Sequence, residues 1–372
     1  MPFFKKNTIY KIIFIIFIFL ILDFVIIQIF GNKINDLMYG KYDTSNKSAY
    51  NNRIKDHHEL KKNQELTRKW HKTYLHKTDK YGNRIGDCPT NNKNKKSIFI
   101  VGDSMVEGIG INYEDTFVGL LNCNFNNLNI LNLGVASYSP ILYHEKIKKI
   151  TSKVGKPHSV FIFLGINDIQ DDANYIKIKN RIYDSSEKNY FSENEIIGYL
   201  FNDIKFFLKN SFLTFKFIDL IKDNYEKRNR KKSNSKNRLD LFNLGINNPK
   251  NIWTFDEKSY LKYGKKGLIK SKNNLDKIYK YSLDNNFKFY LVIWPSTDQI
   301  YYNDTNSIHR KYWKKWSDEK KIKLIDLNKF FFEKEKKETI KKYFIPGDTH
   351  WNKYGHKLIY ENLSKEIRKI NF

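Results

Sequence analysis

Short apolar runs alternate with longer amphipathic segments through most of the chain after residue 96. The runs cover residues 97–101, 129–133, 159–164, 288–293 and 323–327, and the last run is the least apolar. They are apolar on both faces, which is typical of strands in a parallel sheet that helices cover on both sides. The pattern predicts an α/β fold, a three-layer α/β/α sandwich around a five-stranded parallel sheet.

The segments beside these runs carry helix signals. The segment after the second run begins with Ser139 as an N-cap and Pro140 at the first helical position, and it ends at Gly155. The last segment, 352–370, has apolar residues at helical spacing. More than a hundred residues separate the third run from the fourth, too many for one crossover helix. We therefore expect a helical insertion over about residues 173–285, beside the functional site.

The N-terminal stretch 12–30 is apolar except for Asp23 and Gln28, and three lysines precede it. This length suits one membrane-spanning helix of roughly 20 residues, and the lysines favour a cytoplasmic N-terminus. We expect a membrane anchor over residues 1–31, a stalk over 32–96 and an extracytoplasmic domain over 97–372. A cleaved signal peptide and a buried soluble helix are the alternatives, and the stretch lacks a small-residue cleavage site.

The net charge of +27 is spread along the whole chain, so it does not indicate a nucleic-acid partner. The two cysteines, Cys88 and Cys123, lack CxxC spacing and adjacent histidines, so we expect no metal site. An extracytoplasmic location permits a disulfide between them, and the sequence leaves their pairing open.

The first run ends on Gly102, Asp103 and Ser104. A serine hydroxyl becomes a nucleophile when a base takes its proton and N–H groups stabilise the oxyanion. Taken alone, however, this tripeptide favours an ordinary helix N-cap.

Three further segments favour the nucleophile. Gly134 follows the second run and Asn167 follows the third, while Asp348 and His350 precede the last helix. The C-terminal ends of parallel strands meet at one edge of a sheet, where ligands bind. The segments therefore predict a nucleophile, oxyanion donors, a base and an orienting acid at one site.

In this order the four segments resemble the sequence blocks of the SGNH (GDSL-type) hydrolases, outside the insertion. The resemblance implies a flavodoxin-like sandwich in which Ser104 is the nucleophile, His350 the general base, and Asp348 the residue that orients His350. It also implies an oxyanion hole made by the Ser104 and Gly134 N–H groups and the Asn167 side-chain amide.

One block departs from the usual D-x-x-H, because a single residue separates Asp348 from His350. The resulting D-T-H-W resembles a block of alginate-type polysaccharide O-acetyltransferases, which implies acetyl groups on glycans as the substrate. His356 is a rival base that we expect to be structural, and Trp351 either packs or lines a sugar site. Asp168 is expected to form a turn. Three acids are expected to be solvated: Glu107, Asp171 and Asp172.

These features together predict a membrane-anchored serine esterase or acyltransferase that acts on acyl esters of envelope glycans and needs no cofactor or metal. The alternative is a non-catalytic subunit that assembles envelope polysaccharide or binds glycans. Hydrolase and transferase use the same triad, so the sequence does not separate them, and it leaves the oligomeric state open.

Overall fold

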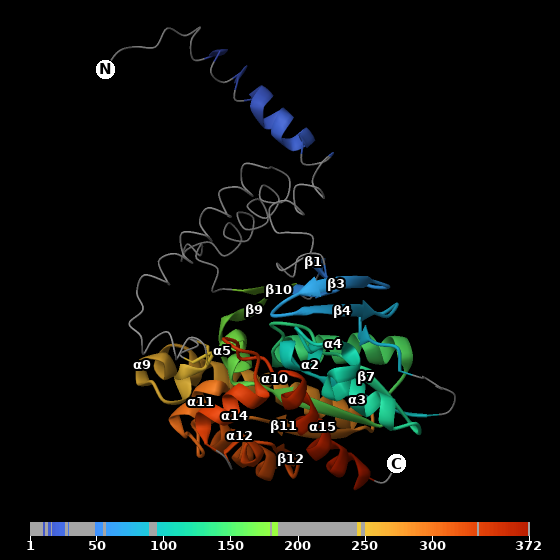
Figure 1. Cartoon of the computed structure of the whole chain (residues 1–372), viewed down its shortest axis with the longest axis vertical. Coiled ribbons are helices and arrows are strands. Elements are labelled where there is room, and N and C mark those ends of the chain that lie inside the picture. Colours follow the sequence, from blue (N-terminus) through green and yellow to red (C-terminus); the bar gives the residue numbers. More distant parts are fainter. Residues whose placement is uncertain are drawn as a thin grey trace. The chain divides into compact units, whose positions relative to one another are not determined.

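The computed structural model describes residues 10–11, 14–15, 17–26, 29, 49–54, 57–88, 95–178, 181–184, 244–246, 250–332 and 335–370. Most of these residues lie in one compact unit, 44–185 with 238–372, and many of its elements are labelled in Figure 1. The described residues before residue 30 belong to a second unit and are helical.

A mixed sheet forms the middle of the larger unit, in the strand order β12-β11-β8-β6-β7-β5-β4-β3. Its five parallel strands are β6 (Lys96–Val101), β7 (Leu128–Asn132), β8 (Ser159–Leu164), β11 (Lys288–Ile293) and β12 (Lys323–Asp326). These are the five predicted runs, and their order is the flavodoxin-like 2-1-3-4-5. The order reverses between β6 and β8, which places the end of β6 at the position where such sheets bind ligands.

The sheet has eight strands in the described part of the chain, not the expected five. Antiparallel strands β5 (Arg84–Ile85), β4 (Thr73–Thr78) and β3 (Glu65–Lys69) extend it beyond β7, and β1 (Tyr50–Ile54) pairs with β2 (His57–Leu60). All of them fall in the stretch expected to be a stalk. The sequence pattern missed them because their inward side chains are largely polar, as with Arg68 and His76, which are buried.

Helices cover both faces of the sheet, as predicted. One face carries α4 (Pro140–Val154), α5 (Ile166–Asn174), α10 (Lys265–Asp284) and α12 (Ile308–Lys320). The other carries α2 (Ser104–Glu107), α3 (Phe117–Asn124), α13 (Lys329–Phe332), α14 (Lys336–Tyr343) and α15 (Lys353–Arg368). The remaining elements are short: η1 (Tyr113–Asp115), η2 (Ile252–Thr254), α9 (Glu257–Ser259), η3 (Tyr260–Gly264) and α11 (Thr297–Tyr302).

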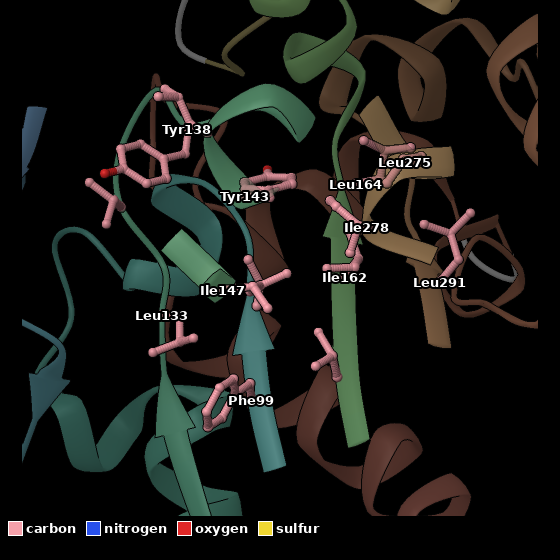
Figure 2. Packing of buried hydrophobic residues seen from close by; sticks show 14 of the residues in the cluster. Phe99, Leu133, Tyr138, Tyr143, Ile147, Ile162, Leu164, Leu275, Ile278 and Leu291 are labelled. Atoms are coloured by element: carbon pink, nitrogen blue, oxygen red, sulfur yellow. The ribbon is translucent and has the colours of Figure 1, made fainter. Parts of the chain in front are cut away.

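Alternate residues of the central strands feed the two cores. In β6, Phe99 faces the layer of α4 and α10, whereas Ile100 faces the layer of α3 and α15. Figure 2 shows the first of these cores, where Phe99 and Ile162 of the sheet lie beneath Ile147 of α4 and Ile278 of α10. Burial on both faces is what the continuous apolar runs predicted.

The expected insertion is only partly described. Its end, α10, packs against α4 and α5 and leads into β11, so it is a crossover helix of the sandwich. Its start forms a hairpin of β9 (Tyr175–Ile178) and β10 (Arg181–Asp184). Residues 185–243 and 247–249 lie outside the described residues, and with them most of the predicted helical cap.

Two features of the N-terminal half complete the fold. In the described part of the chain, no helix has both the length and the apolar character needed to cross a membrane. Residues 12, 13, 16, 27, 28 and 30 of the predicted span are not described. Cys88 and Cys123 form a disulfide, which joins the segment after β5 to α3.

Candidate active site

Ser104 stands where β6 turns into α2. The Asp103 carboxylate caps this short helix by accepting the Met105 N–H at 2.9 Å. Gly102 is required there, because a Cβ would lie 2.3 Å from the Val106 side chain. The turn thus leaves Ser104 facing a cavity at the end of the parallel sheet.

Ser104, His350 and Asp348 form a hydrogen-bonded chain. His350 Nε2 lies 2.8 Å from Ser104 Oγ, and His350 Nδ1 lies 2.8 Å from Asp348 Oδ1. The fold brings Ser104 and His350 together across a sequence separation of 246, since α15 and the turn before it pack on the α3 side of the sheet. This is the geometry that a serine nucleophile, its base and an orienting acid require.

A tight turn lets the Asp348 carboxylate reach the His350 ring although only one residue separates them. Ile345 closes the turn by donating its N–H to the His350 carbonyl at 2.8 Å and accepting the Asp348 N–H at 3.0 Å. Within the turn, Gly347 has φ of 72°, which favours glycine. Asp348 Oδ1 also accepts the Thr349 N–H at 2.6 Å, so the carboxylate folds back over its own turn and reaches the His350 ring.

Asp348 and His350 shift each other's pKa so that both ionised forms are favoured. Burial lowers the pKa of His350, but the hydrogen bond and negative charge of Asp348 outweigh burial, and the pKa is raised overall. Burial raises the pKa of Asp348, yet the hydrogen bonds from His350 and Trp70 and the charge of His350 hold it well below its usual value. Asp348 is therefore ionised at neutral pH and stabilises the protonated imidazole.

Trp70 extends the hydrogen-bonded chain of Ser104, His350 and Asp348, and the sequence interpretation missed it. Its indole Nε1–H donates to Asp348 Oδ2, and its ring meets the His350 ring edge to face at a centroid distance of 5.6 Å. Trp70 follows β3, in the stretch expected to be a stalk. No local pattern marks a tryptophan that meets its partner 278 residues later.

The Gly134 N–H was expected to be an oxyanion donor, but it already has a hydrogen-bond partner. This N–H donates to Asn132 Oδ1 at 2.9 Å and is therefore occupied. A Cβ at Gly134 would lie 2.2 Å from the Glu107 backbone nitrogen, so this glycine lets α2 pack closely against the end of β7. Close packing explains the residue without an oxyanion role.

Ser137, three residues later, offers the free N–H instead. It lines the cavity with Ser104, and its φ of 59° is unusual for a residue other than glycine. Within the described residues neither the Ser137 N–H nor the Ser104 N–H has an acceptor. The sequence interpretation missed Ser137 because a serine gives no advance sign of a left-handed conformation.

Asn167 lines the same cavity, but its amide is engaged by two acids. Its Nδ2 donates to Asp103 Oδ2 at 2.8 Å and to Asp168 Oδ1 at 3.1 Å. Burial raises the pKa of both carboxyls, and the nearby Asp103 raises that of Asp168 further. An oxyanion role for Asn167 therefore requires one of these hydrogen bonds to be exchanged. Asp168 also accepts the Gly165 N–H at 2.7 Å, so it caps the start of α5 and does not form the simple turn expected there.

The cavity beside Ser104 has a volume of about 170 Å³. Ser104 and His350 line it, and so do Trp294 and Lys250. Lys250 pairs with Asp171 at 2.6 Å. The volume is small beside the roughly 300–1,000 Å³ of pockets for drug-sized ligands.

The remaining candidates are structural. His356 is buried, accepts the Phe117 N–H on Nδ1 at 3.3 Å, and its pKa is lowered by burial to about 3. Trp351 is fully buried and packs against Trp294 at a centroid distance of 5.2 Å.

The expectation that three acids are solvated was wrong, because all three are buried: Glu107, Asp171 and Asp172. Among the described residues, no group of three or more His, Cys, Asp or Glu side chains is placed to hold a metal ion.

No family model matches the sequence, and neither does any curated protein. Among solved structures, the chain is similar to a lipolytic protein of the G-D-S-L family from Desulfitobacterium hafniense DCB-2, with 14% identity and a TM-score of 0.38. That match covers 73% of this chain and 99% of the other. The psychrotrophic esterase EstA from Pseudoalteromonas sp. is similar at 12% identity and a TM-score of 0.37, covering 74% and 98%. At TM-scores this low, neither likeness carries a conclusion about the activity of this chain.

Proposed function

We propose that this protein is a serine esterase or acyltransferase of the SGNH type, with Ser104 as nucleophile, His350 as base and Asp348 as the orienting acid. The observation that carries the proposal is the continuous chain of two 2.8 Å contacts from Ser104 through His350 to Asp348. It ends in a cavity that two unoccupied N–H groups of the described residues also line, those of Ser104 and Ser137. A base, a nucleophile and paired donors are what acyl transfer requires.

The reaction follows from these positions. His350 Nε2 takes the proton of Ser104 Oγ as the oxygen bonds to the carbonyl carbon of the ester, and the Ser104 and Ser137 N–H groups stabilise the resulting oxyanion. The tetrahedral intermediate expels the alcohol, which receives the proton from His350, and leaves an acyl-Ser104 ester. Water or a sugar hydroxyl then attacks this ester with His350 again as base, which releases the acid or a new ester and returns the proton to Ser104.

The cavity favours a short acyl group, because a volume of about 170 Å³ leaves little room beyond the reacting centre. We infer an acetyl ester as the substrate, which agrees with the D-T-H-W block and its resemblance to polysaccharide O-acetyltransferases. An acetylated envelope glycan is the substrate class we propose.

We further propose that residues 12–30 attach the protein to a membrane, with the domain that carries Ser104 outside the cytoplasm. The support is the apolar sequence and the exposure of apolar side chains in its described helical part, such as Phe17 and Leu22. Extraction of the full chain from cells with and without detergent, and protease accessibility of intact cells, test the attachment and the orientation. Release of the protein by high salt alone contradicts it.

The catalytic proposal is tested by turnover of p-nitrophenyl acetate. Ser104→Ala and His350→Ala are each expected to lower kcat by at least 1,000-fold, as in other serine triads. Matched controls are Ser152→Ala, an exposed serine on α4, and His158→Ala, which immediately precedes β8 and thus lies at the opposite edge of the sheet. Both controls are expected to keep wild-type rates.

A serine-reactive phosphonate is expected to label Ser104 alone, and peptide mass spectrometry locates the adduct. A label on another residue, or an inert wild-type protein, contradicts the proposal and favours a non-catalytic glycan-binding subunit.

A further inference from the structure

The loop that follows β7 has nearly all of its amides occupied. Four consecutive or near-consecutive residues donate their N–H groups: Gly134 to Asn132 Oδ1, Val135 to Gly102 O, Ala136 to Glu107 Oε2 and Tyr138 to Val135 O. Within the described residues, the Ser137 N–H is the exception. The loop is therefore fixed on both sides of Ser137, which lines the cavity.

Among these acceptors, Glu107 is a buried side chain from another element. Its Oε2 accepts the Ala136 N–H at 2.7 Å. Glu107 lies on α2, three residues after Ser104, so it joins the helix that carries one proposed oxyanion donor to the loop that carries the other. The separation of the Ser104 and Ser137 N–H groups depends on this bridge.

Glu107 is held in turn by three N-terminal strands. The Tyr50 hydroxyl donates to both of its oxygens at 2.7 Å, Arg68 pairs with Oε1 at 3.1 Å, and His76 Nε2 donates to Oε1 at 3.3 Å. Glu107 is 0% exposed. Burial raises its pKa, but the hydrogen bond of His76 and the charge of Arg68 lower it to about 2. Glu107 is thus an ionised carboxylate with its acceptor sites filled.

The carbonyl groups of the loop are held as well. His58 Nε2 donates to the Ala136 carbonyl at 2.6 Å, and the Tyr175 hydroxyl donates to the Ser137 carbonyl at 2.7 Å. His58 therefore fixes the peptide group that contains the Ser137 N–H, and Tyr175 fixes the peptide group that follows it. Preorganised donors of this kind stabilise a developing oxyanion without the cost of reorganisation during the reaction.

We propose that Glu107 is a positioning residue for the oxyanion hole, and that strands β1, β3 and β4 belong to the active site because they hold it. The inference rests on the proposed acyl-transfer function. It assigns to Glu107 an effect on the transition state, through the Ala136 and Ser137 peptides, with little effect on substrate binding.

The test is the Glu107→Gln variant of the full chain with p-nitrophenyl acetate as substrate. We expect kcat to fall about 100-fold with KM unchanged, because a displaced oxyanion donor costs transition-state binding alone. An aryl trifluoromethyl ketone forms a hemiketal with Ser104, and the oxyanion of this hemiketal occupies the same hole. Its affinity is expected to fall in parallel with kcat/KM.

Asp326→Asn is the matched control. Asp326 is also a carboxylate that accepts a backbone N–H, from Asn328 at 3.0 Å, and pairs with an arginine, Arg310, at 2.5 Å. It lies on β12, two strands away from β8 and the site. We expect Asp326→Asn to lower the unfolding midpoint but to leave kcat and the ketone affinity unchanged.

Tyr50→Phe is a milder variant in case Glu107→Gln does not fold, since it removes one hydroxyl and keeps the ring. We expect its kcat to be several-fold lower at unchanged KM. The inference is overturned if a folded Glu107→Gln keeps wild-type kcat and ketone affinity, or if Tyr50→Phe does so when Glu107→Gln is unfolded. An inert wild-type protein instead overturns the proposed function and the inference with it.

Discussion

Asp348 receives hydrogen bonds on both carboxylate oxygens. His350 Nδ1 and the Thr349 amide donate to Oδ1, while the Trp70 indole donates to Oδ2. Each bond stabilises the ionised carboxylate, and the ionised carboxylate raises the pKa of His350. The orientation of the base therefore depends on a tryptophan from the N-terminal strands as well as on the turn before α15.

A prediction at the residue scale concerns the pH dependence of kcat/KM. Only neutral His350 accepts the Ser104 proton, so activity rises with pH through the pKa of His350, which Asp348 raises above its ordinary 6.5. Asp348→Asn removes this negative charge, so the rising limb is expected to move to lower pH. The plateau is expected to fall by about 100- to 10,000-fold, because the ring loses its orientation.

The measurement is kcat/KM for p-nitrophenyl acetate between pH 5 and 9, with Asp326→Asn as the control that keeps the wild-type profile. If the rising limb of the pH profile of Asp348→Asn stays in place or moves to higher pH, Asp348 is not the residue that raises the pKa of His350.

Two strand–helix connections build the rest of the site. The β6–α2 turn presents Ser104, and the β7–α4 loop presents Ser137. They are locked together where α2 approaches Gly134, whose Cα lies against the Glu107 amide. The separation between the two N–H groups therefore depends on how the two elements pack, and the Glu107 bridge from α2 to the loop is part of that packing.

At the element scale, Gly134→Ala and Ser137→Gly are expected to differ. The new Cβ of Gly134→Ala would lie 2.2 Å from the Glu107 nitrogen, so α2 must move. We expect a loss of about 1–3 kcal/mol in the free energy of unfolding and a lower kcat.

Ser137→Gly keeps the backbone N–H, and glycine readily adopts the φ of 59°. We therefore expect its free energy of unfolding to stay within about 1 kcal/mol of wild type and its kcat to stay close to wild type.

Urea unfolding and p-nitrophenyl acetate kinetics measure both effects. If Ser137→Gly abolishes activity, the Ser137 hydroxyl is the required group and the backbone donor assignment is wrong. If Gly134→Ala is neutral in both measurements, the close packing of α2 against β7 is wrong.

On the scale of the whole molecule, the N-terminal strands complete the domain that carries Ser104. Strands β3 to β5 extend the parallel sheet beyond β7, and the Cys88–Cys123 disulfide joins the segment after them to α3. The disulfide spans 35 residues of sequence, so it restricts the unfolded chain. Strands that hold Glu107 and Asp348 are thereby tied covalently to the layer that contains Ser104.

The double variant Cys88→Ser/Cys123→Ser is expected to lose roughly 3–4 kcal/mol of the free energy of unfolding. The same loss is expected when the wild-type protein is unfolded in the presence of a reductant. Urea unfolding measures it, and mass spectrometry after thiol alkylation reports whether the bond is present. Equal unfolding midpoints with and without reductant, or alkylated cysteines in the unreduced protein, contradict the pairing.

Much of the sandwich was predictable because its signals are local. The five apolar runs became β6, β7, β8, β11 and β12, since a strand buried on both faces needs apolar residues at nearly every position. Strands β3 to β5 escaped prediction because their inward positions hold polar residues such as Arg68 and His76, which are buried only through partners elsewhere in the chain. A pattern of hydrophobicity cannot register a buried ion pair.

The same division applies to the site. By itself the sequence predicted the parallel core and the position of Ser104, Asn167, Asp348 and His350 at or beside its C-terminal edge, because the apolar runs and the residues that follow them are local features. Only the tertiary structure decided that, among the described residues, the Gly134 amide has an acceptor and the Ser137 amide has none, that Trp70 supports Asp348, and that Glu107 is a buried bridge. Those roles depend on which groups meet across long stretches of chain, and packing alone determines such contacts.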